Sequence, residues 1–508
     1  MHNKIKGIEE LRRKLLQGGG TRAIKRQHEK GKLTARERVD KLLDPSTFFE
    51  IELFSKPIHT GMEVDKEAMR GDGLVSGYGE VNGRPICVWA QDATVSGGRA
   101  GIIHLRKVCT LMERALRSRV PCVGMIDSEG VKIEDMLTSP TDYPYDKLMY
   151  LQTTASGIIP QISLIMGPCM GSAAISAQLA DFVFMVRNTS YAFVSHIPSE
   201  ISLDEKDEAD SYAKSSGCCD LLADGDEDCI VKARELLSLL PLNNSERNPI
   251  VDTGDDPDRE VPELLKLVPA DSRKPFSMHK AISFIVDNGR FFEIKGSWAQ
   301  NLIVGFARLG GQSVGIIANN PLVMAGCLDV DTADKMARFV RFCDAFSIPL
   351  VYLADTPAFL PSVEQERKGI IRHGAKIVFS NSVASVPQIQ IYVRKCYGGG
   401  GLAMPGNNLG GDFGIAWPTS ELLLMHPEGA VSIIHRKEIK ASENPKEEFK
   451  KRLEKFKREG SVENVWEYNT VQDFINPKDT RARLIKMLNV LEHKVVKMPW
   501  KKSDNMPL

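Results

Sequence analysis

The apolar positions of this chain follow one pattern twice. In the first half, short apolar runs stand in VNGRPICVWAQD, RVPCVGMIDSEG and GIIPQISLIMGPCMGSAA. In the second half, LGGQSVGIIANN, SIPLVYLADTPA and SVPQIQIYVRKCYGGGG follow in the same order. Gly83 and Pro121 stand 38 positions apart, as do Gly311 and Pro349, and both halves then reach a Pro-Gln-Ile triplet. Matched spacings of this kind indicate an internal repeat.

Each repeat predicts alternating strands and helices. Runs such as CVGMID and LVYLAD are apolar, rich in β-branched residues and too short for buried helices, so they predict fully buried strands. Amphipathic stretches at 105–116 and 332–346 stand between such runs and predict helices. We therefore expect an α/β protein with two related halves that arose by internal duplication.

Breaks in this pattern divide the chain into three parts. We expect an N-terminal domain at 1–245, a linker rich in Pro and Asp at 246–275, and a C-terminal domain at 276–508. Residues 1–45 are expected to form an amphipathic helical arm, and the charge-dense residues 437–460 an exposed pair of helices.

Composition narrows the functional classes. Lys plus Arg and Asp plus Glu both number 66, so no charge bias favours nucleic acid or an anionic membrane as a partner. The ten cysteines form no CxxC pair, which predicts buried free thiols in a reducing compartment. The N-terminus lacks the apolar core of a signal peptide, and no apolar run reaches the ~18 residues of a membrane span. These features predict a cytoplasmic protein.

Both repeats end their second buried strand in a glycine cluster, at 167–176 and at 395–404. Glycine allows a tight turn with positive φ, and a helix that starts there exposes N–H groups without intrahelical partners. Two such groups at one carbonyl oxygen would form an oxyanion hole that stabilises an enolate. The alternative is a glycine turn that only packs a helix closely against a strand. Two clusters at equivalent places favour the functional interpretation.

Motifs for several other chemistries are missing from the sequence. No GxGxxG follows a strand and no GxxxxGK[ST] is present, so dinucleotide and ATP binding lack support. No HExxH and no metal-ligand spacing of Cys and His is present, so no metal is predicted. Two oxyanion holes without an evident base suit a reaction whose base is supplied by a cofactor.

Several long stretches resemble the carboxyltransferase subunits of biotin-dependent acyl-CoA carboxylases and decarboxylases, nearest the propionyl-CoA carboxylase β type. The resemblance extends from about residue 8 to the C-terminus. Its most specific stretches are HEKGKLTARERVDKLLDPSTFFEI, PQISLIMGPCMGSAA, DFVFMVRNTSYAFV, AGCLDVDTADKMARFVRFCDAFSIPLV and DFGIAWPTSELLLMHPEGAVSIIHRKEI.

The resemblance implies two tandem crotonase-like domains of the ClpP/crotonase type, the first for acyl-CoA and the second for carboxybiotin. The amides of Gly171 and Ser172 would hold the thioester enolate, and those of Gly399 and Gly400 the biotin oxygen. The ureido anion of biotin would itself remove the α-proton. Family members usually form hexamers, as trimers of dimers, with active sites between the N-half of one subunit and the C-half of another.

The resemblance also implies separate partner chains. This sequence has no biotin-attachment motif of the AMKM type and no ATP-grasp region. A biotin carboxyl carrier and a biotin carboxylase, or a membrane decarboxylase partner, are therefore expected as other chains, and no nucleic acid is expected. The direction of transfer, carboxylation or decarboxylation, stays open.

Residues near the two glycine clusters are candidates for substrate binding. On the first-half side they are Arg99, Gly98, Gly130 and Lys132, with Arg106 and Lys107 as further candidates for the CoA phosphates. On the second-half side, the family commonly reads YGGAYDVM where this chain reads YGGGGLAM, which places Gly401 and Leu402 where substrate choice is set. Loss of the acidic residue predicts an acyl group bulkier or less polar than propionyl. Neutral drift is the alternative.

Other departures keep further functions open. The family commonly reads DSGGARIQEG where this chain reads DSEGVKIEDM, and HIPSEISLDEKDEADS replaces the usual TGE and ELGGA elements. Glu129, Glu134 or His196 could then serve as acid or base in a biotin-independent crotonase-type lyase or hydrolase. A non-catalytic scaffold in a carboxylase assembly is a third alternative. Activity without a biotinylated carrier would favour the lyase, and failure to bind any CoA thioester would favour the scaffold.

Overall fold

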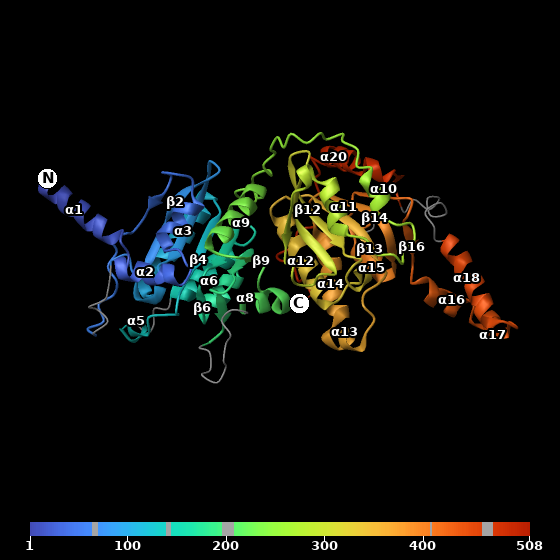
Figure 1. Ribbon diagram of the computed structural model, residues 1–508, viewed down its shortest axis with the longest axis horizontal. Coiled ribbons are helices and arrows are strands. Elements are labelled where there is room, and N and C mark those ends of the chain that lie inside the picture. Colours follow the sequence, from blue (N-terminus) through green and yellow to red (C-terminus); the bar gives the residue numbers. More distant parts are fainter. Residues whose placement is uncertain (63–69, 139–143, 196–207, 407–408, 460–470, 508) are drawn as a thin grey trace. The chain divides into compact units, whose positions relative to one another are not determined.

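The computed structural model describes residues 1–62, 70–138, 144–195, 208–406, 409–459 and 471–507. They form two compact units, Met1–Arg247 and Asn248–Leu508 (Figure 1). Within the described ranges, none of the helices combines the length and apolarity that a bilayer crossing requires.

The first unit is a sheet covered by helices on both faces. Its elements are α1 (His2–Leu15), α2 (Thr21–Glu29), α3 (Ala35–Leu42), β1 (Phe49–Glu50), β2 (Leu74–Val81), β3 (Arg84–Gln91), the 3-10 turn η2 (Ser96–Gly98), α4 (Ile102–Ser118), β4 (Cys122–Ile126), α5 (Ile133–Thr138), α6 (Pro144–Ala155), β5 (Gln161–Ile165), β6 (Pro168–Met170), α7 (Ser172–Gln178), β7 (Phe182–Val186), β8 (Tyr191–Phe193), α8 (Glu208–Ser211), the π-helical turn η3 (Tyr212–Ser216), β9 (Leu221–Ala223) and α9 (Asp226–Leu239).

The second unit repeats this plan. Its elements are α10 (Glu263–Leu267), α11 (Met278–Ile285), η4 (Asp287–Gly289), β10 (Phe291–Ile294), β11 (Leu302–Leu309), β12 (Gln312–Asn319), the 3-10 turn η5 (Met324–Gly326), α12 (Val330–Ala345), β13 (Leu350–Thr356), α13 (Val363–Lys368), α14 (Ile370–Val383), β14 (Gln388–Tyr397), α15 (Gly398–Ala403), β15 (Phe413–Ala416), β16 (Glu421–Leu423), α16 (Pro427–Ile434), α17 (Arg436–Ala441), α18 (Pro445–Glu459), β17 (Asp473–Phe474), η8 (Pro477–Asp479) and α20 (Thr480–Val490).

The strand order is equivalent in the two units. The first sheet runs β1-β2-β3-β4-β5-β7-β9, and the second runs β10-β11-β12-β13-β14-β15-β17. In each sheet the opening strands pair antiparallel and the later strands pair parallel. Parallel pairs need crossover helices, which explains the alternation of strands and helices along the chain. The α/β fold and the duplication predicted from the sequence are confirmed.

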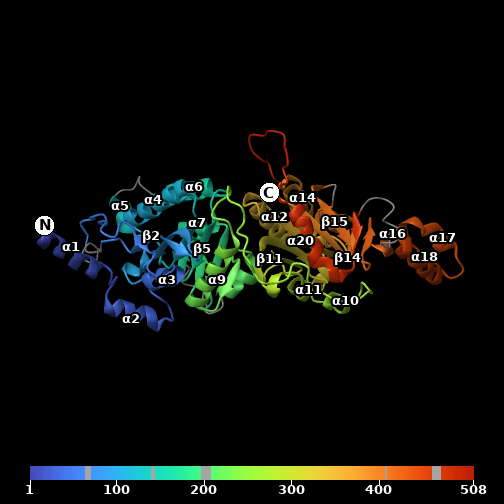
Figure 2. The same ribbon diagram turned by 90° about the horizontal axis from the view of Figure 1, so that it is seen from above.

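Amphipathic helices complete the layers. In the first unit, α4 and α6 lie on one side of the sheet, and α3 and α9 on the other (Figure 2). Leu105, Val108 and Met112 of α4 are buried at helical spacing, so one stripe of this helix meets the core. In the second unit, side chains of α11 and α20 join those of the central strands in one core cluster. The predicted helices at 105–116 and 332–346 correspond to α4 and α12.

Buried polar contacts repeat as well. Gln161 and Gln388, from the two Pro-Gln-Ile triplets, each donate the backbone N–H to an aspartate carboxylate at 2.8 Å, Asp181 in the first unit and Asp412 in the second. Such contacts fix the start of β5 and β14, because an unpaired buried N–H is costly. The two strands that lead to the glycine clusters are therefore anchored alike.

A buried lysine on the first crossover helix is also common to both units. Lys107 donates to the carbonyl oxygens of Gly71 and Leu74 at 2.8 Å, and Lys335 donates to that of Leu302 at 2.7 Å. Burial lowers the pKa of Lys107 to about 8 and that of Lys335 to about 7. Lys107, a candidate ligand for the CoA phosphates, instead ties α4 to the backbone before and within β2.

Candidate active site

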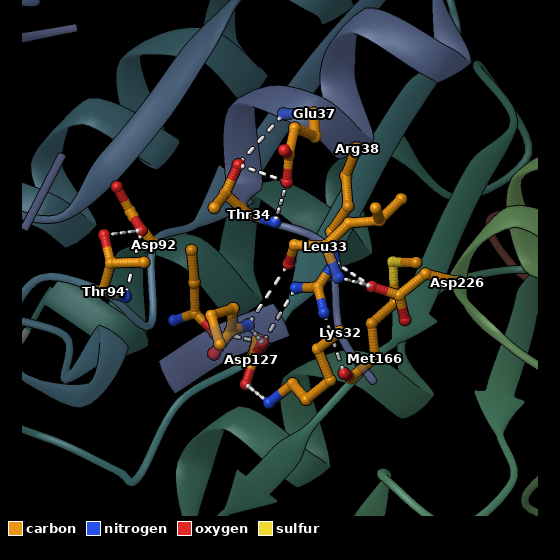
Figure 3. Close-up of polar contacts among 12 residues, drawn as sticks. Lys32, Leu33, Thr34, Glu37, Arg38, Asp92, Thr94, Asp127, Met166 and Asp226 are labelled. Carbon is orange, nitrogen blue, oxygen red and sulfur yellow. Dashed lines mark hydrogen bonds and ion pairs between the residues drawn. The ribbon is translucent and has the colours of Figure 1, made fainter. Parts of the chain in front are cut away.

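A buried ion cluster ties the N-terminal arm to the first sheet (Figure 3). Asp127 follows β4 directly and is 1% exposed. Its carboxylate accepts from Lys32 at 2.6 Å, from Arg38 at 2.9 Å and from Gln27 at 3.0 Å. Arg38 also donates Nε–H to Asp226 at 2.7 Å. Because buried charges are tolerated only when paired, these contacts hold residues 27–38 at the end of β4.

Local capping explains how Arg38 reaches this position. Thr34 precedes α3, and its hydroxyl oxygen accepts the N–H of Glu37 while the Glu37 carboxylate accepts the N–H of Thr34 at 2.8 Å. This reciprocal pair is a capping box, which fixes the start of the helix. Arg38 then stands in the first turn of α3, with no exposed surface, and also donates to the carbonyl oxygen of Met166 at 3.1 Å (Figure 3). The arm is therefore built into the fold.

Beside this cluster the first unit contains a cavity of about 650 Å³. One wall comes from the arm and carries the basic side chains of Arg26 and Lys30, and the other comes from the loop around Thr94 and Gly97. The two walls are joined by the Gly19 N–H, which donates to the Thr94 hydroxyl at 3.0 Å. A polar cavity with two cations suits a ligand that carries phosphate groups. We call it the first cavity.

The structure places Arg99 and Lys132 differently. Arg99 follows η2 beside the first cavity, where its guanidinium lies 3.5 Å from the carboxylate of Glu134 and its side chain is 30% exposed. Lys132 is buried in an ion pair with Asp72, whose carboxylate also accepts the N–H of His104 at 2.9 Å. Lys132 therefore does not present its ammonium to the cavity, and this burial gives no support to a role in phosphate binding. Arg106 is exposed on α4.

The other first-half candidates surround the same loop. Gly98 has a φ of +69°, and a Cβ there would collide with the carbonyl oxygen of Asp127, so only glycine fits. Gly130 accepts the N–H of Ala100 at 2.9 Å and has a φ of +116°. Glu129 lines the first cavity. His196 lies outside the described residues.

The first glycine cluster forms the turn between β6 and α7. Gly171 adopts a φ of 64° and a ψ of −132°, which is accessible to glycine and costly for other residues. Its N–H donates to the carbonyl oxygen of Phe193 in β8 at 2.8 Å, so this amide is engaged within the fold. Ser172 begins α7 with a negative φ, so a serine does not strain the backbone at this position.

The second cluster forms the first turn of α15. Gly398 turns the chain with a φ of 48°, and Gly399 and Gly400 follow, where helix N–H groups lack intrahelical acceptors. A Cβ on Gly400 would lie 2.9 Å from the backbone carbon of Ala358, so this turn lies directly against the segment after β13. Gly401 packs in the same way against Cys396, where a Cβ would lie 2.8 Å from Sγ, whereas Leu402 is 54% exposed.

A second buried carboxylate fixes the strand that carries this cluster. Asp355, at the end of β13, has no exposed surface and accepts from Arg394 of β14 at 2.6 Å. The Arg394 guanidinium also lies 4.6 Å from the ring centroid of Phe276 and donates to the carbonyl oxygen of Lys274 at 2.6 Å. The Asp355 carboxylate also accepts the N–H of Lys395 at 3.2 Å. Because Lys395 stands three residues before Gly398, Asp355 anchors the end of β14.

Comparison with solved structures defines the class of protein. The chain is similar to the transcarboxylase 12S hexamer core solved with methylmalonyl-coenzyme A and methylmalonic acid bound, with a TM-score of 0.95 and 39% identity. The match covers 100% of this chain and 98% of that one. The fold is accordingly that of two tandem crotonase-like domains, as expected.

Comparison with protein families and sequences then gives the family. Residues 26–506 match the family model described as carboxyl transferase domain. The chain is 41% identical to the carboxyltransferase subunit of propionyl-CoA carboxylase from Haloferax mediterranei, over 100% of both chains. It is also 41% identical to subunit alpha of methylmalonyl-CoA decarboxylase from Propionigenium modestum, over 99% of both. The chain belongs to the carboxyl transferase family and is a biotin-dependent carboxyltransferase that acts on CoA thioesters, as the sequence resemblance predicts.

Sequence reasoning missed the cations of the arm. Arg26 and Lys30 line the first cavity, while Lys32 and Arg38 hold it in place, yet residues 1–45 were predicted only as a helical arm. One signal was present: Asp127 ends CVGMID as Asp355 ends LVYLAD, and a repeated carboxylate directly after an apolar run demands buried cationic partners.

Replacing Arg38 with methionine should destabilise the first unit strongly. The change leaves Asp226 without its guanidinium partner and Asp127 with one cation fewer, and breaking such a buried pair costs about 3–5 kcal/mol. Denaturant unfolding would measure the loss. Lys41→Met on the same helix is the control, because its exposed pair with Glu227 contributes at most about 1 kcal/mol. Equal losses for the two variants would contradict the assignment.

Proposed function

We propose that this chain moves a carboxyl group between biotin on a separate carrier protein and the α-carbon of an acyl-CoA. The observation that carries the proposal is the basic first cavity beside η2, in a chain of the carboxyl transferase family. Because relatives are named both for propionyl-CoA carboxylase and for methylmalonyl-CoA decarboxylase, the proposal covers both directions of transfer.

The first cavity would take the phosphate-bearing end of CoA. Arg26 and Lys30 supply two cations from the arm, and the loop at Thr94–Gly97 supplies hydroxyl and backbone groups. Arg99, although paired with Glu134, stays partly exposed next to this loop and can turn toward a ligand. Among the described residues that line the cavity, Glu129 is the one acidic side chain, so this lining has a positive excess.

The glycine-headed helices would hold negative charge on the reacting groups. In the second unit, the amides of Gly399 and Gly400 stand in the first turn of α15 and would donate to the ureido oxygen of biotin. In the first unit, Ser172 would donate to the thioester oxygen from the first turn of α7. Gly171, whose N–H donates to Phe193, would join it only by sharing that N–H between two acceptors. The biotin cofactor supplies the base, and the chain supplies position and fixed dipoles.

The acyl group would be bulkier or more apolar than propionyl. Leu402 is exposed on α15, where the family commonly has an acidic residue, so the surface offered near the second cluster is apolar. Gly401 contributes by close packing on Cys396 and adds no open space of its own.

A relative supports the proposed assembly, and the cysteines support the proposed location. The similar transcarboxylase core is a hexamer, and we propose a hexamer for this chain, with a biotin carrier and either a biotin carboxylase or a membrane decarboxylase as partners. All ten cysteines are free thiols, and most are buried, which supports the reducing conditions of the cytoplasm.

Removing the two cations of the first cavity should weaken acyl-CoA binding. Arg26→Ala combined with Lys30→Ala is expected to raise the KM for acyl-CoA about tenfold with little change in kcat, because the contacts hold a remote part of the substrate. Lys25→Ala, on the same helix but outside the lining, is the control. A KM that stays unchanged in the double variant would remove the cavity from the site.

Acyl-dephospho-CoA tests the same contacts without a mutation. If the two cations meet the 3′-phosphate, this substrate should show the raised KM with the unmodified protein and no further increase with the double variant. An added increase in the double variant would assign the cations to the diphosphate instead.

Replacing Gly400 with alanine should abolish most carboxyl transfer. The added Cβ would press against Ala358 and shift the first turn of α15, and losing one oxyanion donor costs about 10²–10³ in rate. Transfer from carboxylated carrier, with acyl-CoA binding measured in parallel, would separate catalysis from folding. Gly429→Ala in α16, where a Cβ would meet only the end of Met425 at 3.4 Å, is the control. Normal transfer by Gly400→Ala would exclude the proposed hole.

A panel of acyl-CoAs tests the proposed substrate. With purified carrier, kcat/KM for apolar acyl groups of four or more carbons should exceed the values for propionyl-CoA and acetyl-CoA. Leu402→Asp should shift the preference toward the smaller groups. Turnover of acetyl-CoA or propionyl-CoA equal to that of every bulkier substrate would contradict the role given to Leu402.

A further inference from the structure

The second unit contains a smaller cavity to which the proposed function assigns no ligand group. It measures about 230 Å³, and the basic side chains of Arg273, Arg394, Lys395 and Lys457 are among its lining. Within the described part of the chain, Glu428 is the one residue of this lining that carries a carboxylate. We call it the second cavity.

The second cavity occupies the place in its unit that the first cavity occupies in the other. Ala325 of η5 lines it, as Gly97 of η2 lines the first. The two turns share one conformation, with φ and ψ of 53° and 21° at Ala325 and 66° and 19° at Gly97. The strands that follow the two turns, β4 and β13, end close to corresponding positions of the repeat. After β13, Pro357 lines the second cavity, and after β4, Glu129 lines the first. The duplication therefore gave each unit a cavity at the same turn.

In each unit, a basic residue from the segment that precedes one helix, α3 or α11, lines the cavity. Lys30 stands five residues before α3, and Arg273 stands five residues before α11. Each helix precedes the first strand of its sheet, and each segment lines its own cavity. A cation at this place is thus common to the two units, whereas the acidic residue Glu129 has an uncharged counterpart in Pro357.

Two lysines of the second cavity are only loosely neutralised. The ammonium of Lys395 lies 3.6 Å from the Asp355 carboxylate, which already pairs closely with Arg394. The ammonium of Lys457 lies 3.7 Å from the Glu428 carboxylate. Both separations exceed a normal hydrogen bond, so both ammonium groups can turn to an added acceptor.

The start of helix α16 adds to the positive potential. His426, Pro427 and Glu428, at the beginning of this eight-residue helix, line the cavity. A helix N-terminus carries a partial positive charge and N–H groups without intrahelical acceptors. The Glu428 carboxylate, 2.7 Å from His426 Nδ1, partly offsets this potential.

We propose that the second cavity is an anion site that binds a phosphate or diphosphate group. Arg273 pairs with Asp271 and Arg394 with Asp355, so the two lysines and the start of α16 supply the positive potential, and lysine is a common phosphate ligand. Its volume is below the ~300–1,000 Å³ of sites for drug-sized ligands, so it can hold the phosphates of a ligand but not a whole CoA molecule. The phosphates could come from free diphosphate or from the end of a nucleotide such as adenosine 3′,5′-diphosphate.

Isothermal titration of the full chain at constant ionic strength would test this site. In the Arg26→Ala/Lys30→Ala variant, whose first cavity has lost its two cations, inorganic diphosphate should bind with one site per chain, and adding Lys395→Met or Lys457→Met should weaken its binding about tenfold or more. Lys455→Met, on α18 but outside the lining, should bind as the unmodified chain does. Tighter binding of adenosine 3′,5′-diphosphate, lost in the same two variants, would assign the phosphates to a nucleotide.

Variants of the first cavity keep the two sites distinguishable. Arg26→Ala combined with Lys30→Ala should leave diphosphate binding at the second cavity unchanged, whatever its effect on acyl-CoA. Absence of saturable binding, or binding that is lost in the Arg26/Lys30 variant and kept in the Lys395 and Lys457 variants, would overturn the proposal. Failure of the first cavity to bind acyl-CoA would not bear on it.

Discussion

A carboxylate buried at the end of the same strand in each unit constrains both halves of this molecule. Asp127 and Asp355 have almost no exposed surface, and an unpaired charge in such a place would cost several kcal/mol. Each carboxylate must therefore pair with cations, and the segment that supplies the cation is held at the end of that strand. In the first unit, Lys32 and Arg38 bring in the arm. In the second, Arg394 brings in the strand that leads to the glycine cluster.

The two pairings have different consequences for the sites. In the first unit, the arm forms one wall of a cavity of about 650 Å³ and places Arg26 and Lys30 on that wall. Holding β14 leaves the second unit with a cavity of about 230 Å³ and fixes the first turn of α15. The same buried carboxylate thus leaves a larger cavity with a basic wall from the arm in the first unit, and a smaller cavity with a fixed glycine turn in the second.

Much of the fold could be predicted from the sequence, because buried strands and amphipathic helices leave periodic patterns. The spacing of the prolines and the two glycine clusters located the repeats and the turns before α7 and α15. The direction in which a single side chain points leaves no periodic pattern in the sequence, so it could not be predicted. Lys107 and Lys132 looked like surface cations beside a CoA site, yet both are buried among backbone carbonyls or against Asp72. Partners distant in sequence, such as Arg38 and Asp127, could not be paired from composition or spacing.

The glycine turns show why geometry decides more than motif does. The sequence predicts the same role for Gly171 and Gly399, yet the N–H of Gly171 donates to Phe193. At Gly171 the glycine is required by its backbone conformation, and at Gly400 by the close approach of Ala358. The two units consequently differ in how freely their amides can meet an oxyanion. If these amides stabilise an oxyanion, as we propose, the contact with Ala358 that positions the first turn of α15 matters to the chemistry as much as the amides themselves.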